Sequence, residues 1–262
     1  MFKLAFLSSV ETFSTHRKAG NGVKRKTNFR YLDSNSDAVG IVKQEITRKL
    51  NLMLEDLNLP QMPLVPQYRQ ASCLEEQEYA EVGPISAVLT SPPYANCFDY
   101  SKIYMSELWL GDFFGSKQDQ QLFREKSVRS HVHATWDDRH TDMGVSIVNN
   151  EIRDHLKLEK LWSPKIGNML SGYFKDLGKY LSLVHPHLIP GAYVGFVVGN
   201  SFYGGIPIAT DLLLTELGKK TGYIPHAVKV YRKIIPSSQQ YRKQSHDRRF
   251  MRESLVILQK PK

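Results

Sequence analysis

The stretch TSPPYANCFDY, residues 90–100, follows directly on the apolar run ISAVL. Two prolines and a tyrosine end a predicted buried strand abruptly here, and Ser91 stands at its exit. Proline fixes its own φ and restricts the residue before it, so the carbonyls of Ser91, Pro92 and Pro93 are held in nearly fixed directions. Open α/β sheets bind their ligands at the carboxyl ends of strands. The corner therefore predicts a ligand site.

This corner combines hydrogen-bond acceptors with a flat aromatic face. Neither proline has an N–H, so the Ser91 hydroxyl and the Pro92 carbonyl could accept hydrogen bonds from an exocyclic amino group, while Tyr94 stacks on the ring that carries it. Two fixed acceptors would draw the amino nitrogen towards a tetrahedral shape and aim its lone pair at an electrophile. The alternative is a proline-bounded strand end whose tyrosine packs on the core.

The composition is that of a globular protein. The 262 residues fit one large domain, or a domain with an appended arm, and 41% are apolar. The longest apolar runs fall short of the roughly 20 residues of a membrane span, and Glu11 interrupts MFKLAFLSSVETF (1–13), which predicts an amphipathic helix and not a signal peptide. Cys73 and Cys97 have neither disulfide-framework nor metal-ligand spacing, which favours a reducing, cytoplasmic location.

Positive charge is concentrated in two segments. The formal net charge is +9; residues 17–30 carry six basic residues and no acidic one, and residues 232–252 carry seven with the single acid Asp247. Asn, Gln, Ser and aromatic residues lie between these charges, a pattern that favours a polyanionic partner over a merely solvated surface. Charge alone does not distinguish DNA from RNA or from a membrane surface.

Apolar periodicity predicts an α/β fold. Strands are expected at 85–91, 192–200, 226–234 and 253–260, and helices up to about residue 16 and over 38–57, 100–114, 165–184 and 209–221. This order is that of the second half of a doubly wound sheet ending in an antiparallel pair. We expect a helical segment and connector over 1–80 and a catalytic half-domain over 81–262, with a polar insert at 116–165.

TSPPY after a hydrophobic strand resembles the catalytic motif of the DNA amino-methyltransferases, which methylate N4 of cytosine or N6 of adenine. The likeness extends over roughly residues 85 to 260. SPPYANCFDYSKIYMSELWLGDF (91–113) is similar to the motif and following helix of a branch found in restriction–modification systems. YFKDLGKYLSLVHPHLIPGAYVGFVVGNS (173–201) and RRFMRESLVILQK (248–260) resemble its next helix and strand and its closing strand. The resemblance implies the second half of a Rossmann-like methyltransferase fold, and it makes the polar insert 116–165 a candidate for target recognition.

The resemblance also implies roles for the corner. Ser91 and the Pro92 carbonyl would bond the target amino group, Pro93 would fix the turn, and Tyr94 would stack on a base flipped out of double-stranded DNA. The SPPY form is associated with cytosine N4, and S-adenosylmethionine is the methyl donor, with direct in-line transfer and no covalent enzyme intermediate. Ser91, Pro92 and Asn200, which ends the strand 192–200, are candidate cofactor contacts; a helix cap is the alternative for Asn200.

A flipped base requires a cationic track for the DNA phosphates. The candidate nucleic-acid contacts are Arg17, Lys18, Lys24, Arg25, Lys26, Arg124, Arg129, Arg242, Lys243, Arg248 and Arg249. No metal site is expected, because His131, His133 and His140 with Asp137 and Asp138 match no zinc or two-metal spacing. Asp99 is expected to cap the next helix.

The glycine-rich cofactor turn of the resembled family, Phe-x-Gly-x-Gly, is not found in the sequence. Three interpretations stay open. The first is a split enzyme whose cofactor-binding half is a second polypeptide, which would pair with the open edge of the strand 85–91. The second is a complete enzyme with degenerate cofactor motifs, and the third is a non-catalytic nucleic-acid-binding subunit or a fragment of a longer gene. An RNA base or a glutamine side chain is a further possible substrate.

Overall fold

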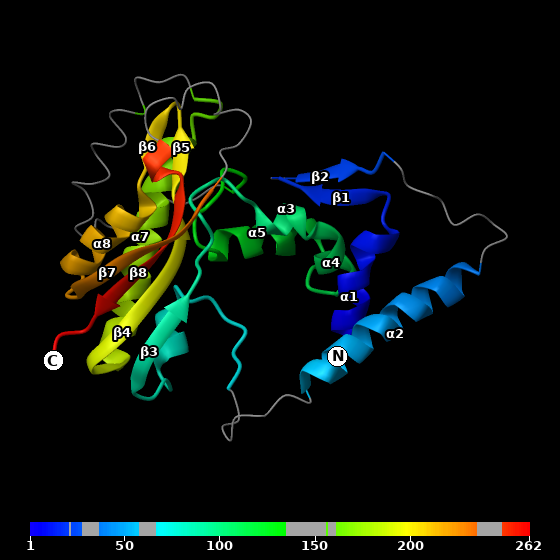
Figure 1. Cartoon of the computed structure of the whole chain (residues 1–262), viewed down its shortest axis with the longest axis horizontal. Coiled ribbons are helices and arrows are strands. Elements are labelled where there is room, and N and C mark those ends of the chain that lie inside the picture. Colours follow the sequence, from blue (N-terminus) through cyan, green and yellow to red (C-terminus); the bar gives the residue numbers. More distant parts are fainter. Residues whose placement is uncertain (21, 28–36, 58–66, 135–155, 157–160, 235–247) are drawn as a thin grey trace. The chain divides into compact units, whose positions relative to one another are not determined.

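A computed structural model describes the chain except for residues 21, 28–36, 58–66, 135–155, 157–160 and 235–247 (Figure 1). The chain forms two compact units. The first comprises residues 1–70 and 99–123, and the second comprises residues 71–98 and 124–262. The structure thus groups residues 99–123 with the N-terminal segment, whereas the sequence predicts a single boundary near residue 80.

A four-stranded sheet organises the second unit. Its strands β3 (Ile85–Thr90), β4 (Leu188–Gly199), β8 (Arg252–Gln259) and β7 (Ile224–Lys233) lie in the order β3-β4-β8-β7 (Figure 1). β3 runs parallel to β4, and β8 runs antiparallel to both of its neighbours. The predicted strands and the antiparallel closing pair are confirmed, although β4 begins at Leu188, earlier than expected.

Helices cover one face of this sheet. α7 (Ile166–Val184) and α8 (Thr210–Lys220) pack together, and α8 also contacts β4, β7 and β8. Side chains of a strand point alternately to its two faces, so Val194, Phe196 and Val198 of β4 share one face, and all three are fully buried. The Tyr180 ring of α7 meets the Phe196 ring edge-on at 5.9 Å. The core therefore lies between these helices and the sheet.

The other face of the sheet is less covered, and its β3 edge is open. Within the described residues β3 pairs only with β4, in a register that sets Leu89 beside Gly195. Leu89 is 77% exposed and lies near Leu255 of β8, which is itself only partly buried. The expectation of a buried strand is thus wrong for the outward-facing side chains, because nothing described covers them.

Short elements complete the second unit. A two-stranded sheet, β5 (Ser201–Tyr203) and β6 (Ile206–Ile208), follows β4 directly. The 3-10 turns are η1 (Glu76–Tyr79), η2 (His185–His187) and η3 (Arg248–Phe250). No helix in the described part of the chain is both long and apolar enough to cross a bilayer.

Helices and a hairpin form the first unit. α1 packs against α2 and α4, and β1 pairs with β2 as an antiparallel hairpin. No strand is among the elements predicted for residues 1–80, where this hairpin lies. The elements are α1 (Phe2–Phe13), β1 (His16–Ala19), β2 (Gly22–Arg25), α2 (Ala38–Leu57), α3 (Tyr100–Ile103), α4 (Met105–Leu110) and α5 (Lys117–Lys126), whose last turn belongs to the second unit.

The helix predicted over 100–114 is two shorter helices. α3 and α4 meet at Tyr104, whose φ of −99° and ψ of 21° are not helical, and α4 is capped by Gly111. Asp99 caps α3 as expected, since its carboxylate accepts the Lys102 N–H at 3.2 Å. α5 lies inside the polar insert, where weak periodicity predicted no helix.

A buried ion pair fixes the segment after α5 to α7. Asp176 accepts Arg129 Nη2 at 2.7 Å, Arg129 Nε at 3.0 Å and the Arg129 backbone N–H at 2.8 Å. Both side chains are only 9% exposed. A Cβ on Gly172 would lie 2.7 Å from Arg129 Cδ, so this glycine makes room for the arginine. Arg129 is therefore a structural residue, and its assignment to DNA contacts is wrong.

Asp176→Asn should destabilise the fold by about 3–5 kcal/mol, because it leaves the buried Arg129 charge without its counter-ion. Urea denaturation of the full chain measures this loss. The matched control is Glu216→Gln, which removes a carboxylate from an ion pair with Lys219 whose side chains are both 52% exposed. That variant should change the free energy of unfolding by less than about 1 kcal/mol. Equal effects of the two variants would contradict the structural role of the buried pair.

Candidate active site

The SPPY corner leaves β3 at its carboxyl end and is fixed to β4 at its first residue. The Ser91 hydroxyl donates to the Val197 carbonyl at 3.2 Å. A carbonyl oxygen cannot donate, so this bond uses the only hydrogen of the hydroxyl and leaves its oxygen as an acceptor. Ser91 is exposed. The corner thus presents an oriented acceptor, which suits an amino group and not another acceptor.

Tyr94 rests on the backbone of β4. A Cβ on Gly199 would lie 2.7 Å from Tyr94 Cδ2 and 2.8 Å from Cε2, closer than real contacts allow. Only glycine therefore lets this side of the ring approach the strand. The Cδ2–Cε2 side of the ring packs on β4, as the alternative of a packed tyrosine predicts. Tyr94 as a whole is only partly buried. The ring is thus held at Gly199, two residues beyond Val197, to which Ser91 is bonded.

The loop after the corner is bonded to β5. The buried Tyr203 hydroxyl donates to the Ala95 carbonyl at 2.9 Å and lies 3.4 Å from Cys97 Sγ. Burial, with a smaller contribution from Cys97, raises the pKa of Tyr203 well above its ordinary value, so the hydroxyl stays protonated as a donor. Tyr94 O accepts the Asn96 N–H at 2.7 Å, and Cys97 has a φ of 61°. These contacts hold the loop tightly against β5.

The sequence alone assigns no role to Gly199 or Tyr203. A glycine at the end of an otherwise apolar strand is a signal of close approach by another group, and it could have been read from VVGN (197–200). The Tyr203 bond joins residues 108 positions apart, and no local pattern predicts it.

Asn200 connects β4 to α8. Its Oδ1 accepts the Asp211 N–H at 3.1 Å, which satisfies a donor in the first turn of α8, so the expected alternative of a helix cap is realised. Asp211 also accepts Arg252 Nε and the Ser254 hydroxyl, each at 2.8 Å. Asn200 Nδ2 and Ser201 Oγ are buried and have no hydrogen-bond partner among the described residues. Two unused polar groups thus follow Gly199 directly.

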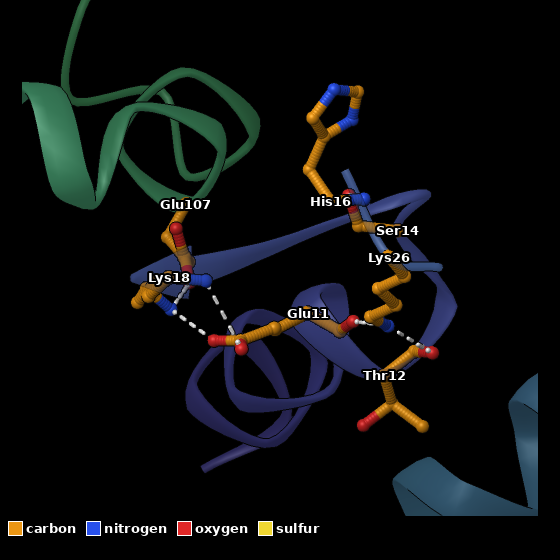
Figure 2. A network of polar contacts seen from close by, with 7 residues as sticks. All are labelled: Glu11, Thr12, Ser14, His16, Lys18, Lys26 and Glu107. Atoms are coloured by element: carbon orange, nitrogen blue, oxygen red, sulfur yellow. Dashed lines mark hydrogen bonds and ion pairs between the residues drawn. The ribbon is translucent and has the colours of Figure 1, made fainter. Parts of the chain in front are cut away.

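Two of the predicted DNA-binding lysines serve the first unit itself (Figure 2). Lys18 Nζ pairs with Glu107 and, at 3.2 Å, with Glu11, and it lies 4.7 Å from the centre of the Tyr104 ring. Burial lowers the pKa of Lys18, but hydrogen bonds and charge attraction from Glu107 and Glu11 outweigh burial and raise the pKa above its ordinary value. Lys18 is thus held as a charged anchor within the first unit, and its contact with DNA phosphates stays a prediction.

Lys26 binds the carboxyl end of helix α1. Its Nζ donates to the carbonyls of Glu11 at 2.6 Å and Thr12 at 3.2 Å, in the last turn of the helix (Figure 2). A cation at this end complements the helix dipole and satisfies carbonyls that have no partner within the helix. The ammonium group of Lys26 is thus engaged within the first unit, and its contact with DNA stays a prediction as well.

The remaining basic candidates are distributed over both units. Arg17, Lys24, Arg25 and Arg249 are exposed, and Arg124 is partly buried. Arg242 and Lys243 lie outside the described residues, as does the side chain of Arg248.

Neither cysteine is poised as a nucleophile. Burial raises the pKa of the Cys97 thiol to about 11 and raises that of Cys73, so both are protonated near neutral pH. The His131 and His133 rings stack at 5.9 Å. The other residues considered as metal ligands, Asp137, Asp138 and His140, lie outside the described residues.

The chain is similar to curated Type II methyltransferases over its whole length. It is 25% identical over 312 residues to M.BsoBI of Geobacillus stearothermophilus and 27% identical over 289 residues to M.AvaI of Nostoc sp. and of Anabaena variabilis. It spans only 58–59% of the length of these relatives. No protein-family model matches the chain.

Solved structures similar to the chain include a putative DNA modification methylase from Thermus thermophilus. That structure is 13% identical, with a TM-score of 0.36, over 73% of this chain and 52% of the other. A second structure of this methylase, in complex with S-adenosyl-L-methionine, matches 42% of this chain and 51% of its own at 15% identity and a TM-score of 0.30.

Gly199→Ala should displace the Tyr94 ring and cost about 1–3 kcal/mol, the usual range for an overfilled site. The matched control is Gly83→Ala in the same unit, where an added Cβ meets no atom within 4 Å. Thermal denaturation of both variants measures the cost, and a crystal structure of Gly199→Ala locates the ring. An unshifted ring with wild-type stability would contradict the tight packing of Tyr94 on β4.

Proposed function

We propose that this chain is the catalytic part of an S-adenosylmethionine-dependent DNA methyltransferase of a restriction–modification system, acting in the cytoplasm on an exocyclic amino group, N4 of cytosine. The observation that carries the proposal is the Ser91 hydroxyl, which donates to Val197 at 3.2 Å and is exposed as an acceptor at the end of β3. The similarity of the whole chain to Type II methyltransferases supports it.

The residues of the corner act by orientation. The Ser91 oxygen and the Pro92 carbonyl accept the two amino hydrogens, which withdraws the nitrogen lone pair from the base and aims it outwards. Tyr94, fixed against Gly199, provides the face on which a flipped base stacks. Pro93 holds the turn, so little reorganisation is needed when the base enters.

The unpaired groups after β4 fit a polar ligand. Asn200 Nδ2 and Ser201 Oγ are buried without partners among the described residues, a costly state that a bound acceptor relieves. Asn200, Ser91 and Pro92 would hold S-adenosylmethionine, which supplies an electrophilic methyl group when bound. The nitrogen is the only nucleophile in this proposal, and both thiols stay protonated.

The cofactor-binding half is supplied by a second polypeptide in this proposal. The Phe-x-Gly-x-Gly turn is not found in these 262 residues, which span 58–59% of the length of the curated relatives. Two features of the described sheet support a partner: the β3 edge is unpaired, and Leu89 on its outer face is 77% exposed. A strand added to β3 would satisfy its free backbone groups and cover this side chain.

We expect the chain alone not to bind S-adenosylmethionine in isothermal titration calorimetry. A mixture with the polypeptide encoded next to it should bind the cofactor and methylate cytosine in duplex DNA, since the proposed partner supplies the cofactor-binding half. Binding by the isolated chain would contradict the need for a partner. Methylation of a transcript but not of a duplex would identify RNA as the substrate, and no methylation by the mixture would contradict the enzymatic role.

Ser91→Ala should reduce methylation by the assembled enzyme at least about a hundredfold, because an oriented acceptor is lost, while DNA affinity stays near that of the wild type. Single-turnover methylation and fluorescence anisotropy separate the two effects. Ser86→Ala is the control, since Ser86 is an exposed serine of the same strand. Wild-type methylation by Ser91→Ala would refute the role of this hydroxyl.

Tyr94→Ala should weaken capture of the target base by about 1–3 kcal/mol, the range for stacking of one base on an aromatic ring. A duplex with 2-aminopurine at the target position reports base capture by fluorescence. Tyr68→Ala is the control, because Tyr68 is 86% exposed and has no assigned role. Unchanged capture with lowered stability would leave packing as the only role of Tyr94.

A further inference from the structure

The β1–β2 hairpin has two chemically different faces. The antiparallel register sets Arg17 opposite Lys24 and Lys18 opposite Val23. Because successive side chains of a strand point to opposite faces, Arg17 and Lys24 share one face and Lys18 lies on the other. The basic side chains of the hairpin therefore lie on two different faces, with Arg17 and Lys24 on one and Lys18 on the other.

The Lys18 face is bound to the rest of the first unit. Lys18 pairs with Glu11 of α1 and Glu107 of α4, and Lys26, directly after β2, donates to the end of α1 (Figure 2). An isolated two-stranded hairpin is marginally stable, so these anchors give the hairpin its fixed position on the two helices. Of the two anchors only Lys18 lies within the paired strands, and its side chain lies on the face opposite Arg17 and Lys24.

Two like charges lie directly opposite each other on that outer face. Arg17 and Lys24 are both exposed, and neither makes an ion pair with any residue that the structure describes. Like charges in directly opposite positions destabilise a β-hairpin, and their Cβ atoms are typically about 4.5–5.5 Å apart. The pair thus costs stability within the free chain, and an anion placed between the two side chains would remove that cost.

We propose that Arg17 and Lys24 form a clamp for one phosphate of the DNA backbone; this proposal rests on the proposed function. The planar guanidinium matches two phosphate oxygens, and the ammonium adds a point charge from the facing strand. Lys18 and Lys26 take no part, because their ammonium groups hold the hairpin in place. The clamp binds a backbone phosphate, which is the same at every base pair, so it positions the duplex without selecting a base.

Salt dependence of DNA affinity tests the clamp. The double variant Arg17→Gln/Lys24→Gln should bind a fluorescein-labelled duplex more weakly, whatever its sequence, and the slope of log K against log salt concentration should fall by about 1. The full chain is measured alone and mixed with the cofactor-binding polypeptide. The control Lys43→Gln/Lys117→Gln removes two exposed charges of the same unit and should leave the slope unchanged.

Thermal denaturation distinguishes binding from folding. The Arg17→Gln/Lys24→Gln variant should melt no lower than the wild type, since it removes a repulsion, whereas Lys18→Gln should melt lower because it removes an anchor. A wild-type salt slope in the Arg17→Gln/Lys24→Gln variant, or an equal change in the control, would overturn the clamp and leave the proposed function standing. A wild-type protein that binds no duplex in low salt, alone or in the mixture, would overturn both.

Discussion

The parallel pairing of β3 with β4 is the constraint on which the candidate site depends. Its register brings the corner after β3 alongside the last residues of β4, so that Ser91 reaches Val197 and Tyr94 reaches Gly199. β8 then ties the end of β4 to α8 through Asp211. The chemistry of the corner is therefore positioned by a strand more than 100 residues away, through hydrogen bonds of the sheet and one packing contact.

Local sequence predicts the parts of this arrangement that local forces determine. The alternation of apolar residues predicts the four strands of the main sheet, and helical periodicity predicts α2 with the bounds that the structure has, Ala38–Leu57. The prolines predict the corner itself. The break at Tyr104 and the hairpin after α1 were missed, because the contacts of Lys18 with Glu107 and Tyr104 join segments distant in the chain.

Charge is where sequence reasoning is least reliable in this protein. A lysine or arginine looks the same in the sequence whether it meets solvent, a phosphate or a buried carboxylate. Arg129 is bound by Asp176 in the interior, and Lys18 and Lys26 hold the hairpin on α1, whereas Arg17 and Lys24 face outwards. Only the strand register and the burial of each side chain separate these roles, and both are properties of the folded chain.

The open edge of β3 also bears on how this protein must be made. Among the described residues β3 has one free edge and an outward-facing leucine. Such an edge is a template for any other strand, including the same strand of a second copy, and edge-to-edge pairing of this kind leads to aggregation. Pro92 and Pro93 follow β3 closely. Because prolines lack N–H donors, they limit the extension of such pairing beyond the carboxyl end of the strand. Its six residues, Ile85–Thr90, carry no charge that would oppose it. Synthesis of this chain with the β3 edge uncovered would therefore carry a risk of aggregation that grows with its concentration.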